Sequence, residues 1–415
     1  MKNFLEEYPA PEVMAKEING LPLPIFREAN GHIHTPYSFS AFSDLDVVFK
    51  MAKEEKIAVL GINDFYVTDG YDSFLKGCVN NKIFPLFNIE FIGLMKEEQK
   101  NGIRINDPNN PGRIYFSGKG LDYPFHTGFM LRKQLKSVIQ ESQVQIKAMI
   151  AKLNGLIRAE NPSLSLSYEI IKSKYAHNLV RERHIAKALR LDAVEHFSTS
   201  EEKISFLEKL YGGKKSKADL SNPAALENEI RSNLLKSGGA AFVEEDESSF
   251  LELKKIVKII LKAGGIPCYP VLLDDPTGKC TEFEADPEKL HLTLKELGIE
   301  CIELIPGRND INILKKFVEF FHSKGFIITF GTEHNTPEMI PLTVSTRGSV
   351  PLDESLKKIA WEGSCIIAAH QYLRADGRQG YVLPDGKHSV DQKHELANLG
   401  NLIIEYYLNR HINET

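Results

Sequence analysis

Histidine and carboxylate residues interrupt the apolar runs of this sequence, usually near the end of a run. Imidazole nitrogen and carboxylate oxygen are ligands that zinc, iron and manganese accept. If the fold brings such residues together, they predict a metal site. The residues in these positions are His32, His34, Asp64, Glu90, Glu303, Glu333 and His334.

His32 and His34 are two residues apart at the end of the run REANGHIH. Side chains with this spacing on a strand point to the same face, so both imidazoles can reach one cation. The alternative is a pair of partly exposed histidines. Glu90, inside IFPLFNIEF, favours the metal because a carboxylate is costly to bury alone, although an ion pair with Arg or Lys would also satisfy it. Asp64, after IAVLGIN, is either a ligand or an acceptor that orients a histidine.

The runs that carry these residues alternate with amphipathic stretches. This alternation predicts parallel strands buried on both faces, with helices between them. Ser43 or Asp44 is expected to cap the first of these helices, LDVVFKMAKEEK. The C-terminal ends of strands in a parallel barrel converge on one mouth, where catalytic and metal-binding groups gather. The strand candidates are 57–62, 83–91, 265–273, 299–305 and 325–331.

The chain divides into parts by its pattern. We expect the barrel to be interrupted by a long, charged, helical insertion with few strand signals, and to be followed by a helical region packed on it. The expected parts are an N-terminal extension (1–24), the barrel (25–128 and 265–350), the insertion (129–264) and the C-terminal region (351–415).

The composition is that of a globular protein: 415 residues, 42% hydrophobic and 26% charged. The net charge of −5 and the lack of a long basic block argue against nucleic-acid binding. The N-terminus does not have the pattern of a signal peptide, and no apolar stretch is long enough for a membrane span. The five cysteines are scattered without a CxxC pair, which favours a reducing cytoplasm.

Six segments together resemble the motifs of the PHP (polymerase and histidinol phosphatase) superfamily of metal-dependent phosphoesterases, in the right order over about residues 28–340. The resemblance implies an α/β fold, a distorted (β/α)7-type barrel of the PHP kind, with a helical insertion and a helical C-terminal region. RERHIAKAL resembles a helical segment common in the family. The six segments are HIHTPYS, VLGINDF, NIEFIG, GRIYFSG, AGGIPCYP and FGTEHN.

The departures from the family pattern are systematic. Phe65, Tyr115 and Tyr269 stand where the family has histidines, Glu333 stands for its closing Asp, and Asn335 for its closing His. Family members commonly hold two or three metals. Sorting the changes by site implies that one site is kept, formed by His32, His34, Glu90 and Glu333, and that the others are lost. We therefore expect one divalent ion per chain, which could be zinc, manganese or iron.

The resemblance implies a metal-dependent hydrolase, a phosphoesterase acting on a small phosphorylated compound. Asp64 or His334 would be the base, Tyr115 or Tyr269 would donate hydrogen bonds to the developing charge, and Arg308 would clamp the anion. The alternative is a PHP-fold binding or regulatory protein that has lost catalysis. A proofreading nuclease is a weaker reading because the chain is acidic. The sequence does not indicate an oligomeric state.

Overall fold

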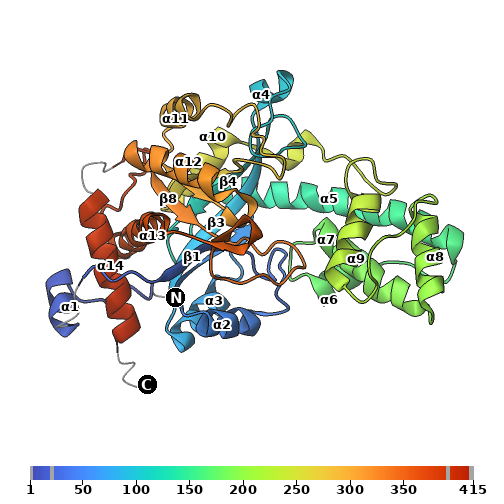
Figure 1. Ribbon diagram of the computed structural model, residues 1–415, viewed down its shortest axis with the longest axis horizontal. Helices are drawn as coiled ribbons and strands as arrows, with labels where there is room; N and C mark the ends of the chain where they lie inside the picture. The colour runs from blue at the N-terminus through green and yellow to red at the C-terminus, as the bar shows by residue number, and fades with distance from the viewer. Residues whose placement is uncertain (1–2, 19–22, 389–392, 411–415) are drawn as a thin grey trace.

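A nearly closed β-barrel forms the centre of the computed structural model, which describes residues 3–18, 23–388 and 393–410 (Figure 1). The strand order is β1-β2-β3-β4-β6-β7-β8, with the short β5 beside β3. A bridge between Ile33 and Glu333 brings β1 next to the chain that follows β8. These strands are β1 (Glu28–Ile33), β2 (Ile57–Phe65), β3 (Phe84–Leu94), β4 (Arg113–Lys119), β5 (Leu251–Glu252), β6 (Ile266–Val271), β7 (Cys301–Leu304) and β8 (Ile327–Phe330).

The barrel is mixed rather than all parallel. The apolar runs predicted parallel strands, and most pairs are parallel, but β4 runs antiparallel to both β3 and β6. The link from β3 to β4 contains only the short helix α4 (Lys96–Lys100) and no crossover helix. Parallel neighbours need a crossover, so the chain turns back at the same end of the barrel instead. A separate two-stranded sheet pairs β9 (Ser345–Thr346) with β10 (Val350–Pro351).

Helices cover the outside of the barrel. Asp44 rather than Ser43 caps α2, because its carboxylate accepts a hydrogen bond from the Val47 N–H at 3.0 Å. The C-terminal helices α13 and α14 pack against each other, and α13 lies against β1 and β8. The helices around the barrel are α1 (Pro11–Glu17), α2 (Leu45–Glu54), α3 (Tyr71–Asn81), α10 (Leu253–Lys262), α11 (Pro287–Glu296), α12 (Ile311–Ser323), α13 (Glu354–Ala375) and α14 (Lys393–Asn409).

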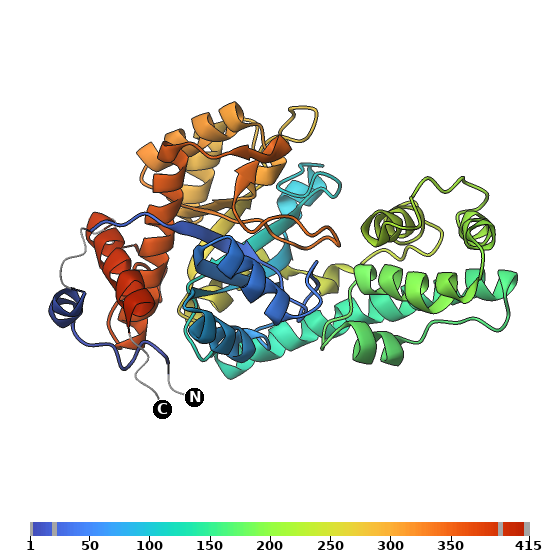
Figure 2. The ribbon, with the colours of Figure 1, turned by 60° about the horizontal axis from the view of Figure 1, so that its bottom comes forward.

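The helices between β4 and β5 extend away from the barrel (Figure 2). They enclose a hydrophobic core of their own, which includes Leu153, Ile185 and Leu207. The next helix, α10, returns to pack on β3, β4 and β6. No helix in the described part of the chain is long and apolar enough to cross a membrane. The helices of this insertion are α5 (Phe129–Glu160), α6 (Tyr168–Tyr175), α7 (Glu182–Ala188), α8 (Ser200–Leu210) and α9 (Pro223–Ile230).

Candidate metal centre

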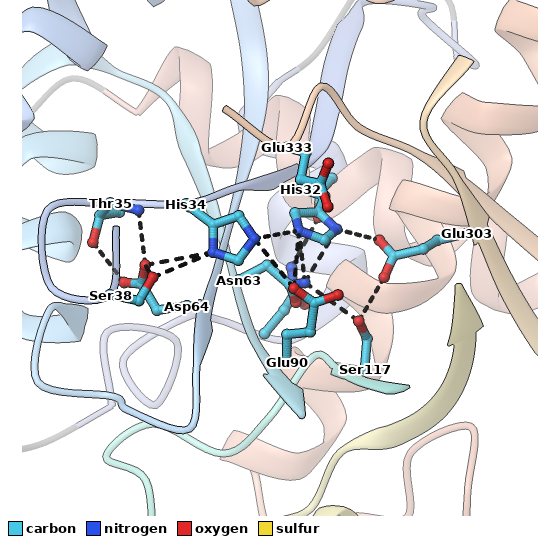
Figure 3. Close-up of polar contacts among 12 residues, drawn as sticks. His32, His34, Thr35, Ser38, Asn63, Asp64, Glu90, Ser117, Glu303 and Glu333 are labelled. Atoms are coloured by element: carbon cyan, nitrogen blue, oxygen red, sulfur yellow. Dashed lines mark hydrogen bonds and ion pairs between the residues drawn. The ribbon is translucent and has the colours of Figure 1, made fainter. Parts of the chain in front are cut away.

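Two histidines and two glutamates meet inside the barrel mouth. His32 lies on β1 and His34 just after it, Glu90 lies on β3, and Glu333 follows β8. One potential ligand atom from each of these residues lies within 4.8 Å of the other three, and all four residues are buried. Figure 3 shows the side chains of His32, His34 and Glu90 turned toward one another. The fold therefore brings together the four residues that the sequence singled out as metal ligands.

The distances between the ligand atoms suit a shared divalent ion. The two histidine Nε2 atoms are 3.3 Å apart, and Glu90 Oε2 lies 3.1 Å from Nε2 of His34 and 3.8 Å from Nε2 of His32. Ligands about 2.1 Å from one ion lie about 3.0 Å apart at a right angle and about 3.4 Å apart at the tetrahedral angle. The two distances that involve His34 have this spacing, and the distance of 3.8 Å from Glu90 Oε2 to Nε2 of His32 is longer.

The outer nitrogens have hydrogen-bond partners, and both Nε2 atoms face the cluster, where the amide nitrogen of Asn63 also lies 3.0 Å from Nε2 of His32. Nδ1 of His32 lies 2.9 Å from Glu303 Oε2, and Nδ1 of His34 lies 3.3 Å from Ser38 Oγ, whose hydroxyl donates to Asp64. These partners place the proton of each ring on Nδ1. Burial lowers the pKa of His32, and it lowers the pKa of His34 to about 3, so both rings are neutral.

The carboxylate of Glu90 has a buried oxygen, Oε2, that has no hydrogen-bond partner among the described residues and that a cation could coordinate. Burial raises the pKa of Glu90 to about 7, because nothing nearby fully compensates the charged form. A buried oxygen that faces two imidazole lone pairs is unfavourable alone but well placed to coordinate an ion. The donor set therefore fits a divalent metal.

A buried ion pair lies behind His32 on the interior of the barrel. Lys119 on β4 donates to Oε2 of Glu303 on β7 at 2.5 Å, and Ser117 donates to Oε1 at 2.6 Å. Burial alone would raise the pKa of Glu303, but the positive charge of Lys119 and the hydrogen bonds from His32 and Lys119 outweigh it and hold that pKa below its usual range. Glu303 is therefore an anion that can both orient His32 and increase the basicity of its Nε2.

Unusual backbone geometry presents Glu333 to the cluster. Glu333 and His334 both adopt positive φ, at 67° and 55°, a conformation that non-glycine residues rarely take. The main chain of Glu333 is held against β1, since its N–H donates to His32 O and its carbonyl accepts from His34 N–H. Gly331 is required for this approach, because a Cβ there would lie 2.3 Å from the Cβ of His32.

Three of the expected catalytic residues do not face the cluster. Asp64 accepts hydrogen bonds from Thr35 and Ser38 and lies 4.0 Å from Nδ1 of His34, on the side away from Nε2. Its place is that of an acceptor behind a histidine, one of the two roles that the sequence left open. Burial raises the pKa of Asp64 to about 6.

His334 and Tyr269 also point elsewhere. The ring of His334 stacks on Phe42, and its nitrogens contact Thr332 Oγ1 at 2.8 Å and the Ile340 carbonyl at 2.9 Å. The hydroxyl of Tyr269 donates to Glu284 at 2.7 Å, outside the barrel interior. In register, Ser117 pairs with Cys268, so Tyr269, the next residue along, faces the opposite side of the sheet.

Two other expected residues do lie at the mouth. Arg308, in the turn after β7, donates to Oε2 of Glu333. Tyr115 lies on the same face of β4 as Ser117, and its ring is 6.2 Å from that of Phe65. Phe65 in turn stacks on His34 with ring centres 4.6 Å apart, and the guanidinium of Arg181 lies 5.2 Å from the centre of the Phe65 ring.

Sequence reasoning missed Ser117 and Asn63, which lie beside His32 and Glu303 in Figure 3, and Lys119, which donates to Glu303. A signal was present for one of them. Lys119 ends the run GRIYFSGK, and a lysine that is completely buried needs an anionic partner.

Comparisons with known proteins agree with this architecture. No protein-family model matches the chain, and no curated protein matches it. Among solved structures, it is similar to a proposed metal-dependent phosphoesterase from Bifidobacterium adolescentis, with 12% identity, a TM-score of 0.52 and coverage of 81% of this chain and 96% of the other. It is also similar to an amidohydrolase from Chromobacterium violaceum, with 16% identity, a TM-score of 0.50 and coverage of 80% and 96%. The chain therefore has the nearly closed α/β barrel of metal-dependent phosphoesterase-like proteins, the fold that its resemblance to the PHP superfamily implied.

Proposed function

We propose that the chain is a metal-dependent hydrolase of the PHP type, a phosphoesterase that acts on a small phosphorylated compound. The single observation that carries this proposal is the convergence of two imidazole lone pairs on Glu90 Oε2, a buried oxygen without a hydrogen-bond partner in the described chain. His32, His34, Glu90 and Glu333 would hold one divalent ion. Such an ion would supply Lewis-acid polarisation of a phosphoryl oxygen.

The side chains at the mouth are suited to an anionic substrate. Arg308 has a planar guanidinium that can bind two phosphoryl oxygens at once, and its side chain is 45% exposed. Tyr115 could donate a hydrogen bond to charge that develops on the same group. The similar amidohydrolase from Chromobacterium violaceum was solved with sulfate bound, and sulfate resembles a phosphate group in shape and charge.

A second candidate function is binding without turnover. The observation that favours it is the placement of the two expected bases, since both carboxylate oxygens of Asp64 and both ring nitrogens of His334 contact other protein groups. A general base must reach the proton that it removes. A protein of this kind would keep the ion and the anion-binding residues but release its ligand unchanged.

Elemental analysis combined with a phosphomonoester screen separates these functions. We expect about one equivalent of divalent metal per chain, and hydrolysis that is lost in His32→Ala. The matched control is His126→Ala, which removes an exposed histidine outside the cluster. Metal together with ligand binding but no turnover would favour the second function. Metal-free protein that stays inactive when divalent ions are added would contradict the hydrolase.

A further inference from the structure

A cavity lies between the loop that follows His34 and the helical insertion. Its volume is about 130 Å³, and residues 36–43 form one wall while α6, α7 and the segment between them form the other. Figure 1 shows α6 and α7 at the end of the insertion that is nearest the barrel. The cavity is separate from the four-residue cluster, since neither His32 nor Glu90 lines it.

The cavity wall is positively charged. No described residue that lines it carries a carboxylate. Lys174 forms an ion pair with Asp192, with Nζ and Oδ1 3.0 Å apart. Nζ of Lys187 lies 5.8 Å from the centre of the Tyr175 ring, and Lys187 has no ion-pair partner in the described chain. The polar and basic lining residues are Ser40, Ser43, Ser173, Lys174, Tyr175, His177, His184 and Lys187.

His184 offers a further donor at the cavity wall. Its Nδ1 accepts the backbone N–H of Arg181 at 2.9 Å at the start of α7, and burial lowers its pKa to about 3. The neutral ring therefore carries its proton on Nε2. His184 is buried, with 2% of its surface exposed. Its Nε2 has no hydrogen-bond partner among the described residues. Because Nε2 itself keeps some exposed surface, it reaches the open space that His184 lines.

We propose that this cavity is a phosphate-type anion site, in which Lys174, Lys187 and the Nε2–H of His184 bind the anionic group. Two ammonium groups and an imidazole N–H form a donor set that suits an oxyanion. The Nε2–H of His184 has no protein partner in the described chain, so it is free to donate to an anion in the cavity. Binding of free phosphate here does not depend on hydrolysis at the metal centre, whereas a substrate that spans both sites rests on the proposed function.

The cavity is also connected to the metal-binding loop. Ser40, in its wall, donates to the backbone carbonyl of His34 at 2.8 Å, and Ala41 N–H donates to the carbonyl of His334 at 2.9 Å. The anion could come from either of two sources. It could be free phosphate, or it could be a second phosphate group of a substrate that spans both sites.

Calorimetric titration with inorganic phosphate tests the site on the full chain after chelator treatment. We expect saturable binding that weakens at least tenfold in Lys174→Met/Lys187→Met. The matched control is Lys203→Met/Lys209→Met, which makes the same change of charge on α8, where these lysines pair with Glu195 and Glu160. Arg308→Gln removes the anion-binding group of the metal centre and should leave this binding unchanged. No binding, or equal loss in both double variants, would overturn the proposal.

The source of the anion follows from a second titration, with fructose 1,6-bisphosphate on the metal-loaded chain. If the bisphosphate binds more than tenfold tighter than phosphate, and the excess disappears in the Lys174→Met/Lys187→Met variant, the cavity receives the second phosphate of a bridging ligand. If the two ligands bind equally and the same variant weakens both, the cavity takes the free anion. If the Lys174→Met/Lys187→Met variant weakens the binding of neither ligand, the cavity is not an anion site.

Discussion

Replacing Glu303 by glutamine should weaken metal binding although Glu303 is not one of the four expected ligands. Its Oε2 lies 2.9 Å from Nδ1 of His32, on the far side of the ring from the cluster. A charged acceptor there holds the proton on Nδ1 and increases the electron density at Nε2. Glutamine keeps the size of the side chain and one acceptor oxygen but removes the charge.

The expected loss can be worked from this geometry. Changing a carboxylate that supports a ligating histidine typically reduces metal affinity by about 10–100-fold, which corresponds to about 1.4–2.7 kcal/mol. The change also leaves the ammonium group of Lys119 without its anion in a site where both side chains are about 1% exposed or less. The double variant Lys119→Met/Glu303→Gln removes this second effect. A reduced affinity that persists in the double variant therefore comes from the contact between Glu303 and His32.

Affinity would be measured by competition with a fluorescent chelator, using zinc or manganese. Glu300→Gln is the matched control, because Glu300 immediately precedes β7 but pairs with Lys295 at 2.6 Å, away from the cluster. An affinity of Glu303→Gln equal to that of the unchanged chain would refute the reasoning, since Glu303 would then have no influence on the His32 nitrogen that faces the ion.

Three further predictions concern stability and the cluster. Gly331→Ala should abolish metal binding in the same chelator assay, because its Cβ would lie 2.3 Å from that of His32; retained affinity would show that the loop adjusts. A divalent ion at 100 times its Kd should stabilise the fold by about 2.7 kcal/mol, seen as a higher melting temperature that EDTA reverses and that His32→Ala no longer shows. Burial raises the pKa of Glu284 to about 7, so its contribution to stability is full below the unfolded pKa of about 4.3 and is lost as pH rises through 7. Glu284→Gln should therefore reduce the fall in unfolding free energy between pH 5 and pH 8, measured by urea denaturation, by up to about 3 kcal/mol, and an unchanged fall would contradict a buried neutral carboxyl.

The sequence could predict the barrel and the gathering of polar residues at its mouth from local pattern, whereas the choice of the four cluster residues as one set followed from the resemblance to the PHP superfamily. Apolar runs identify strands, and polar residues near the ends of strands can be assigned to one mouth without knowing the register. His32 and His34 needed only the two-residue period of a strand. Glu90 was conspicuous because the residues around it are apolar.

The faces of the remaining residues could not be predicted in the same way. Tyr269 faces away from the interior because Cys268 rather than Tyr269 pairs with Ser117, and the register of strands distant in sequence is not visible in a single run. His334 is turned toward Ile340 by two consecutive residues with positive φ. The reversal of β4 depends on the path of the chain through a connection that has no periodic pattern.

Three of the four cluster residues flank the last join in the barrel, with His32 and His34 on one side and Glu333 on the other. β1 and the residues after β8 are linked by the single bridge from Ile33 to Glu333, while the other neighbouring strands share longer ladders. An ion shared by His32, His34 and Glu333 would cross-link β1 to the chain after β8, and Glu90 would connect the ion to β3. Metal loading would then govern how firmly the cylinder is shut, so that amide protons along this join would exchange with solvent more slowly in the loaded protein than in the chelated one.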